Sequence, residues 1–169
     1  MDARVAEFSR RFFGYADASE FPVHDLRREL LTLHATIEDE GGRTELLRIF
    51  HVLSDVVESH LAGQPEVLEA FKIHRQQQTW LLIRAECLRD GEMDNVLLRR
   101  VTGRELRAGR MTSSDPLRRY ALGDMTAFEA FYEMAVEIEG RSKQRQPSPD
   151  DTPLPNTPEF VRMLQPRTD

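Results

Sequence analysis

Apolar residues recur at helical spacing over most of the first 140 positions of the chain. Near the start, Val5, Phe8 and Phe12 stand at i, i+3 and i+7, which places them on one face of a helix. No stretch of useful length alternates apolar and polar residues as a half-buried strand does. The pattern therefore predicts an all-α fold, with one bundle of about six helices over residues 1–140 and an extension over residues 141–169.

Glycines, prolines and capping residues divide this pattern into helices. Asp115 before Pro116 is typical of an N-cap followed by a first helical turn, and Thr126 with Glu129 three residues later forms a capping box. Residues 38–42 contain two glycines and are expected to form a turn. The expected helices cover residues 3–13, about 22–37, about 44–61, 65–89, a segment after Asp94, 115–122 and a last segment after Thr126. The last helix is expected to bury the stripe Phe128, Phe131, Ala135 and Ile138.

The extension differs in composition from the rest of the chain, because residues 141–169 contain six of the nine prolines. A flexible proline-rich tether is expected to lead into a short amphipathic helix that begins at Pro158. Phe160, Met163 and Leu164 stand at i, i+3 and i+4 of that helix. Two interpretations remain open for these side chains. They pack back onto the same chain, or they dock into a groove of a partner, including a second copy of the protein.

The composition is that of an ordinary globular protein, with 40% hydrophobic and 31% charged residues and a formal net charge of −6. One cysteine, Cys87, excludes an internal disulfide framework and a cysteine-based zinc cluster. No apolar run approaches the roughly 20 residues that a membrane span needs. The N-terminus has no basic start followed by an apolar stretch. We therefore expect a cytoplasmic protein that does not insert into a membrane.

Charge is unevenly distributed along the second half of the chain. The segment Arg99–Arg119 holds seven arginines and two acidic residues, whereas Asp124–Glu139 holds five acidic residues and no basic one. Either the two segments lie together and compensate each other, or the arginines face an anionic partner. Aromatic residues for stacking on nucleic-acid bases are scarce in the arginine segment, which favours an acidic protein over nucleic acid. The predicted contact residues are Arg99, Arg100, Arg104 and Arg107.

No motif for catalysis or for a cofactor is evident, and we assign no catalytic residue, no cofactor and no metal ligand. His34 with Glu38 and His51 with Asp55 are i, i+4 pairs, but this spacing alone is thin evidence for metal. A polar insert at residues 74–79 interrupts a long apolar helix just before the single tryptophan, Trp80. The insert marks either the emergence of the helix into solvent or a polar layer at a subunit interface, where Trp80 is a natural anchor.

These observations favour a non-enzymatic interaction or regulatory adaptor protein that presents helical surfaces and a C-terminal docking segment, with a homo-oligomer as one form of association. The first alternative is nucleic-acid binding through Arg99–Arg119. The second is a helical-bundle enzyme that binds a metal or another ligand through His34 and His51. The predicted partner-binding residues are Phe160, Met163, Leu164, Trp80, Arg99, Arg100, Arg104 and Arg107.

Overall fold

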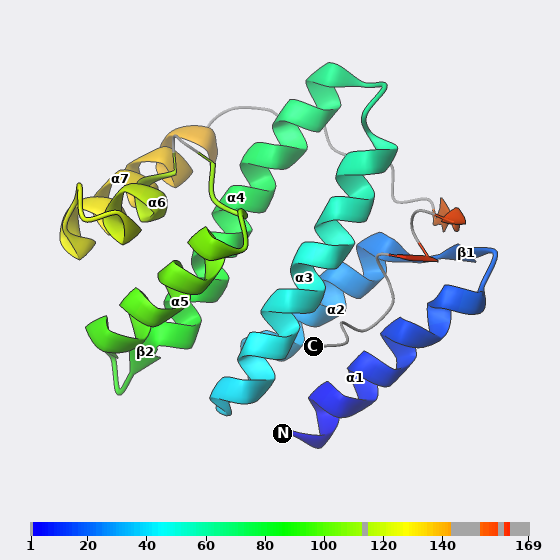
Figure 1. The fold of residues 1–169 in the computed structure, drawn as a ribbon, viewed down its shortest axis with the longest axis horizontal. Helices are drawn as coiled ribbons and strands as arrows, with labels where there is room; N and C mark the ends of the chain where they lie inside the picture. The colour runs from blue at the N-terminus through cyan, green and yellow to red at the C-terminus, as the bar shows by residue number, and fades with distance from the viewer. Residues whose placement is uncertain (1, 113–114, 143–152, 159–160, 163–169) are drawn as a thin grey trace. The chain divides into compact units, whose positions relative to one another are not determined.

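A computed structural model describes residues 2–112, 115–142, 153–158 and 161–162. Within these ranges the chain forms seven α-helices, one short 3-10 helix and two antiparallel pairs of two-residue strands (Figure 1). The predicted all-α class is confirmed, and each of the seven segments expected to be helical overlaps one of these helices. The residues group into two compact units: unit 1 is Met1–Lys72 with Pro147–Asp169, and unit 2 is Ile73–Gln146. The assignment of residues 1–140 to a single domain stays a prediction.

Unit 1 begins with α1 (Ala3–Gly14), which is followed by the 3-10 helix η1 (Tyr15–Asp17). Asp2 caps α1, because its Oδ1 accepts a hydrogen bond from the Arg4 amide at 2.8 Å. The three apolar side chains predicted to share one face of this helix, Val5, Phe8 and Phe12, are all fully buried.

The connection between the next two helices, α2 (Val23–His34) and α3 (Glu40–His60), lies earlier in the chain than the expected turn at residues 38–42. The two glycines predicted to form a turn lie in the first turn of α3, where Asp39 Oδ2 accepts from the Gly42 amide at 2.8 Å. A Cβ atom on Gly42 would lie 3.1 Å from Ile37 and 3.2 Å from Val5. Glycine therefore allows close packing against α1, and the N-cap aspartate starts the helix earlier than the sequence pattern suggested.

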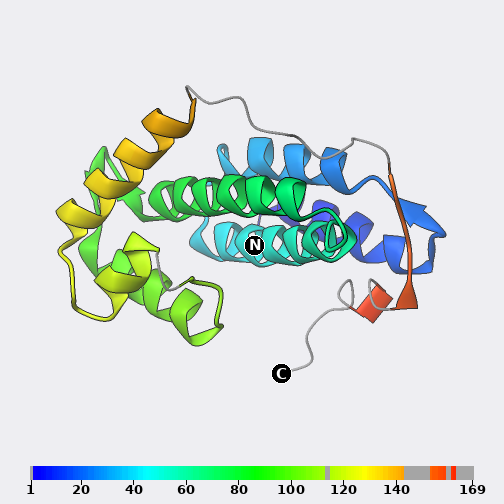
Figure 2. The same ribbon diagram turned by 90° about the horizontal axis from the view of Figure 1, so that it is seen from above.

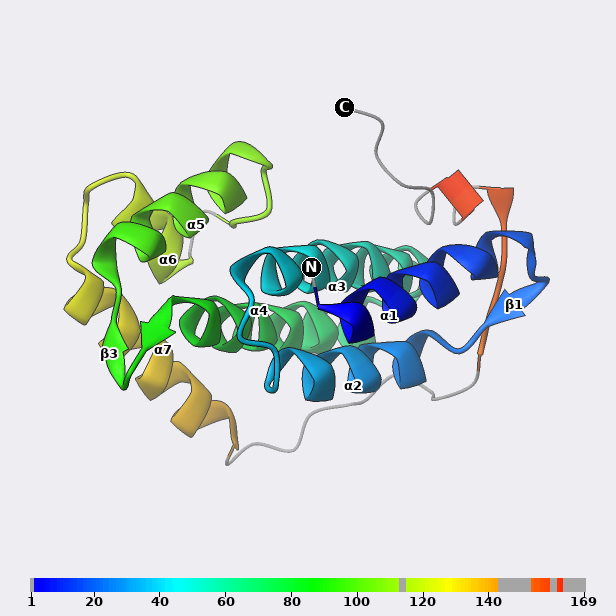
Figure 3. The ribbon, with the colours of Figure 1, turned by 90° about the horizontal axis from the view of Figure 1, so that it is seen from below.

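Helix α3 is apolar on more than one side, and α1 and α2 lie beside it (Figure 3). Arg27 of α2 is only 6% exposed. Its guanidinium lies 5.2 Å from the ring centre of Phe50 and 4.8 Å from that of Phe71, in α4 (Pro65–Cys87). This arginine thus joins three helices of unit 1 through cation–π contacts. The buried apolar residues of α3 are Leu46, Leu47, Ile49, Phe50, Leu53, Val56 and Val57.

A two-residue strand of the C-terminal extension, β4 (Leu154–Pro155), pairs antiparallel with β1 (Glu20–Phe21), and Figure 2 shows the two side by side. The Asn156 amide donates to the Ser19 carbonyl at 2.7 Å. Its side-chain Nδ2 donates to the carbonyls of Tyr15 and Ala18, each at 2.7 Å. The extension is therefore attached to unit 1 at this point, an attachment that the sequence pattern does not indicate.

Replacing Asn156 by alanine should loosen β4, because two side-chain hydrogen bonds are lost at about 0.5–1.5 kcal/mol each. We expect exchange of the backbone amide at position 156 to accelerate by roughly 10-fold to 100-fold. Hydrogen–deuterium exchange measured by NMR checks this. The matched control is Asn95→Ala at an exposed position in unit 2, which should leave the Asn156 amide unchanged. Unaltered exchange in the Asn156 variant would show that the side chain does not hold the strand.

Unit 2 contains the second part of α4, which ends in a hairpin of β2 (Leu88–Arg89) and β3 (Glu92–Met93). The predicted helix therefore extended two residues too far. The reason is the Asp90-Gly91 turn, where φ is 50° at Asp90 and 82° at Gly91. Positive φ at both central residues is the geometry of a type I′ hairpin turn, so the chain reverses as a β-ribbon.

The remaining helices of unit 2 begin at the predicted capping residues. Helix α5 (Asn95–Arg107) follows Asp94, whose side chain accepts from the Leu97 amide at 3.0 Å. Helix α6 (Pro116–Ala121) follows Asp115, which accepts from the Leu117 amide at 2.9 Å. Helix α7 (Ala127–Ser142) comes last, and α6 packs against both α5 and α7. These starts were predictable because capping depends on local sequence.

Candidate partner-binding surface

Helix α7 starts with the predicted capping box. The Glu129 amide donates to Thr126 Oγ1 at 3.2 Å, and the two side chains lie 3.1 Å apart. Ala130 and Met134, four residues apart on one side of the helix, are 0% and 1% exposed. This side faces the interior of unit 2.

The predicted core stripe of α7 is wrong in its orientation. Phe128 is 80% exposed and Ala135 is exposed, although both were expected to be buried. Phe131 is half-buried, and the side chain of Ile138 lies outside the described residues. The physical reason is that α7 packs against α6 on the side with the smaller or more flexible Ala130 and Met134. The large aromatic side chain of Phe128 is left facing outward.

Three large apolar side chains consequently form an exposed stripe on α7. Phe128, Tyr132 and Val136 follow each other at intervals of four residues and are 80%, 64% and 51% exposed. The rings of Phe128 and Tyr132 stack, with centroids 6.4 Å apart and planes at 18°. The interval was visible in the sequence as a second stripe, but the pattern alone did not show which of two stripes faces the core.

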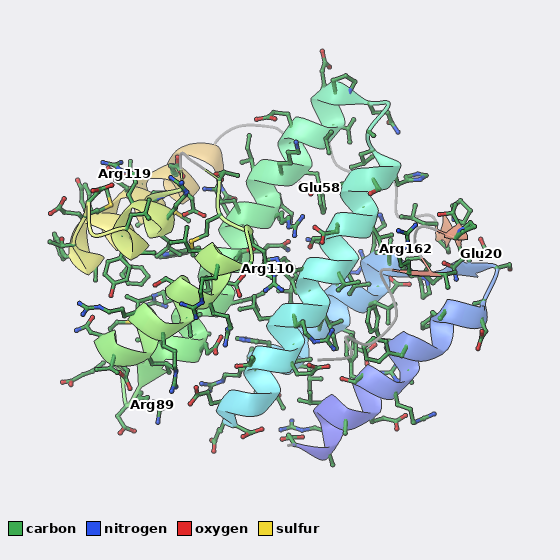
Figure 4. All side chains as sticks on the ribbon, in the orientation of Figure 1. Glu20, Glu58, Arg89, Arg110, Arg119 and Arg162 are labelled. Atoms are coloured by element: carbon green, nitrogen blue, oxygen red, sulfur yellow. The ribbon has the colours of Figure 1, made fainter. Side chains whose placement is uncertain are left out.

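A row of carboxylates runs beside this stripe. Glu129, Glu133 and Glu137 each follow one residue after an apolar member, and all three are exposed. Glu133 pairs with Arg119 of α6 at 3.3 Å, and Figure 4 labels Arg119. We call the six residues Phe128, Glu129, Tyr132, Glu133, Val136 and Glu137 the α7 surface. It offers aromatic faces and carboxylate oxygens side by side.

The four arginines predicted to bind a partner differ in their exposure to solvent. Arg99, Arg100 and Arg107 of α5 are exposed. Arg104 is half-buried, and its Nη2 lies 3.4 Å from both carboxylate oxygens of Glu86. The partner role of these arginines stays a prediction, but Arg104 already has an internal carboxylate to neutralise it.

Two buried carboxylates form ion pairs with arginines inside unit 2. The side chains of Glu86 and Glu105 are 0% and 1% exposed. Arg110, labelled in Figure 4, donates to Glu105 at 3.1 Å, and Arg104 Nε lies 3.6 Å from the same carboxylate. A buried carboxylate needs such partners, because burial without them is costly. We call Glu86, Glu105, Arg104 and Arg110 the buried charge cluster.

Trp80 lies in the core of unit 2 rather than on an exposed surface. It is 7% exposed, and its ring centre lies 5.8 Å from that of Phe131. In the polar insert just before it, Gln76 hydrogen-bonds the buried Asp115. Burial raises the pKa of the Asp115 carboxyl above its ordinary value, while the bond from the Leu117 amide acts in the opposite direction. Gln76 of the insert therefore contributes to the packing around the start of α6.

The predicted docking residues of the extension, Phe160, Met163 and Leu164, lie outside the described residues. The described residues beside them agree with a helix start, because the Val161 amide donates to the Thr157 carbonyl at 2.9 Å. Docking by this segment stays a prediction.

The histidines considered as metal ligands, His34 and His51, are buried, at 2% and 3% exposure. Burial lowers the pKa of His34 from 6.5 to about 4, and the nearby charge of Arg43 acts in the same direction. Across the described ranges, no three His, Cys, Asp or Glu side chains gather as a metal site would require. Nor does any described helix have the length and apolar character needed to cross a bilayer.

No known family model, curated protein or solved structure matches the chain. Function must therefore be inferred from the protein's own side chains. The α7 surface is the described feature that departs most from an ordinary solvated helix, because contiguous exposed apolar side chains mark sites of association.

Proposed function

We propose that this protein is a non-enzymatic interaction protein of the cytoplasm that binds a protein partner through the α7 surface. The observation that carries the proposal is the exposed stripe of Phe128, Tyr132 and Val136 beside three carboxylates. Large aromatic side chains are enriched at the centres of protein interfaces, and flanking charges give specificity.

The chemistry of the α7 surface favours a partner segment that carries arginine. A guanidinium group stacks on aromatic faces and pairs with carboxylates, so it uses both features of the surface at once. Unit 1 has the same combination within itself. Arg48 lies 5.6 Å from the ring centre of Phe13 and 2.6 Å from the Glu45 carboxylate.

A second internal example involves Arg11, which lies 5.7 Å from the ring centre of Phe8 and forms an ion pair with Glu29. These arginines are supplied by the same chain. On the α7 surface, 80% and 64% of Phe128 and Tyr132 remain exposed. That area is available to an arginine from another molecule.

Site-specific crosslinking tests the proposal. With a photo-reactive benzophenone amino acid in place of Tyr132, irradiation of cells that make the full chain should yield one discrete protein adduct. A second substitution, Phe128→Arg, should reduce that adduct at least roughly 10-fold, since it replaces an apolar contact of the stripe by a positive charge that repels the partner's arginine.

The matched control places the benzophenone at Leu81, an exposed apolar residue of α4 at 50% exposure. Its adducts should not respond to Phe128→Arg. Absence of a Tyr132 adduct, or an adduct insensitive to Phe128→Arg, would contradict binding through the α7 surface. Repeating the experiment without residues 158–169 tests the docking segment separately, because only a contribution of that segment would weaken the adduct.

Nucleic-acid binding through Arg99–Arg119 is less well supported than protein binding. Arg104, Arg110 and Arg119 each lie within 4 Å of a carboxylate. Arginines already paired in this way contribute less to the counterion release that drives nucleic-acid binding.

A further inference from the structure

We infer that the arginine-bearing partner of the α7 surface is helix α5 of a second copy of the protein. This inference rests on the proposed binding role of α7 and names its occupant. It follows from three features of the described residues: the exposed face of α5, its match in length and charge to the α7 surface, and the exposure of both faces in the single chain.

The exposed face of α5 is basic and has a defined centre. At 100° per residue, Val96, Gly103 and Arg107 fall within about 20° of one line along the helix. Arg99 and Arg100 lie on either side of that line. Val96 is 82% exposed, and all three arginines are exposed as well. A helix with this face presents guanidinium groups around a small apolar residue.

The two faces match in spacing. Arg99 and Arg107 are eight residues apart, as are Glu129 and Glu137. At 1.5 Å per residue each pair spans about 12 Å along its helix. Packed side by side, α5 of one copy can pair its terminal arginines with carboxylates at both ends of the α7 surface. The aromatic stripe then lies against the arginine side chains, which also stack on rings.

A second copy fits the exposures better than contact within one chain. Phe128 and Tyr132 of α7 and Val96 of α5 all remain at least 64% exposed in the single chain, so these faces do not cover each other there. Direct pairing of two α7 surfaces is less favourable, because it would bring their carboxylates together. A two-fold dimer forms the α5–α7 contact twice and leaves neither face open.

Charge-swapped variants of the full chain test this arrangement by sedimentation equilibrium in low salt. Variant A carries Glu129→Arg and Glu137→Arg, and variant B carries Arg99→Glu and Arg107→Glu. The wild type should dimerise. Each variant alone should dimerise at least roughly 100-fold more weakly, because attractive contacts become repulsive. An equimolar mixture of A and B should recover dimers, since both α5–α7 contacts are then again between opposite charges.

Controls separate this effect from misfolding. Arg10→Glu, an exposed change in unit 1, should leave the dimer unchanged, and circular dichroism should show helical melting in every variant. If variant A does not fold, the neutral pair Glu129→Gln and Glu137→Gln replaces it and should weaken dimerisation less than a reversal. Raising salt from 50 to 500 mM should weaken the wild-type dimer roughly 10-fold.

A wild type that stays monomeric would overturn the inference, as would a dimer indifferent to both reversals or a mixture of A and B that fails to associate. After such a result, a Tyr132 adduct that contains a different protein still supports the proposed function. Failure of the dimer and failure of the proposed function therefore give different results. An adduct of two copies of this chain supports both statements. No adduct and no dimer would reject both.

Discussion

Replacing Glu105 by alanine should lower the free energy of unfolding of unit 2 by about 3–5 kcal/mol. The Glu105 side chain is 1% exposed and accepts from Arg110 at 3.1 Å. Arg110 is itself only 16% exposed, so the substitution leaves a largely buried guanidinium without this carboxylate. Breaking a buried pair from one side is costly because the remaining charge is neither solvated nor neutralised.

The measurement is urea denaturation followed by tryptophan fluorescence. The only tryptophan, Trp80, belongs to unit 2, so its emission reports on this unit. The matched control is Glu133→Ala, which removes an exposed partner of Arg119 and should cost less than about 1 kcal/mol. The double replacement Glu105→Met with Arg110→Met should recover more than half of the loss, because both charges leave together. Equal costs at Glu105 and Glu133 would contradict this account of the cluster.

The second large effect is a loss of stability in acid that depends on His34. Burial lowers the pKa of His34 in the folded protein to about 4, below its ordinary value of 6.5. Above pH 6.5 the imidazole is neutral in both the folded and unfolded states, so stability is full. Between pH 6.5 and 4 the unfolded chain binds a proton that the folded chain does not, and stability falls. The difference corresponds to about 3 kcal/mol at pH 4.

Replacing His34 by leucine should remove this component. His34 Nε2 is buried and makes no hydrogen bond to the described residues, so leucine also relieves an unpaired polar atom at neutral pH. Urea denaturation by circular dichroism between pH 7 and pH 4 should show a loss about 3 kcal/mol smaller than in the wild type. His60→Gln, at the exposed end of α3, should keep the wild-type dependence. An unchanged dependence of the free energy of unfolding on pH in the His34→Leu variant would show that His34 does not cause the loss of stability in acid.

The sequence by itself determined the helical class and most helix starts. Asp94, Asp115 and Thr126 cap their helices where predicted, because a capping bond joins residues two or three positions apart. The face of α1 was also predictable, since that helix has one apolar stripe. The end of α4 was predicted to within two residues, next to the Asp90-Gly91 turn. Its hairpin was missed because two-residue strands carry no alternating pattern.

Only the tertiary structure decided which side of α7 is buried. That helix has apolar residues on two sides, and packing against α6 selected the side of Ala130 and Met134. The exposed Phe128 and Tyr132, which carry the proposed function, follow from that choice. Periodicity reports that a helix has an apolar face, but with two such faces the neighbouring helix selects one.

The buried charge cluster and the attachment of β4 were also decided by the tertiary structure, because both join segments that are far apart in the sequence. Glu86 and Glu105 stand 19 residues apart, and Asn156 lies 141 residues from Tyr15. Nothing in the local sequence marks these residues as neighbours or as buried. Local contacts over a few residues were readable from the chain itself, whereas contacts between distant segments exist only once the helices pack.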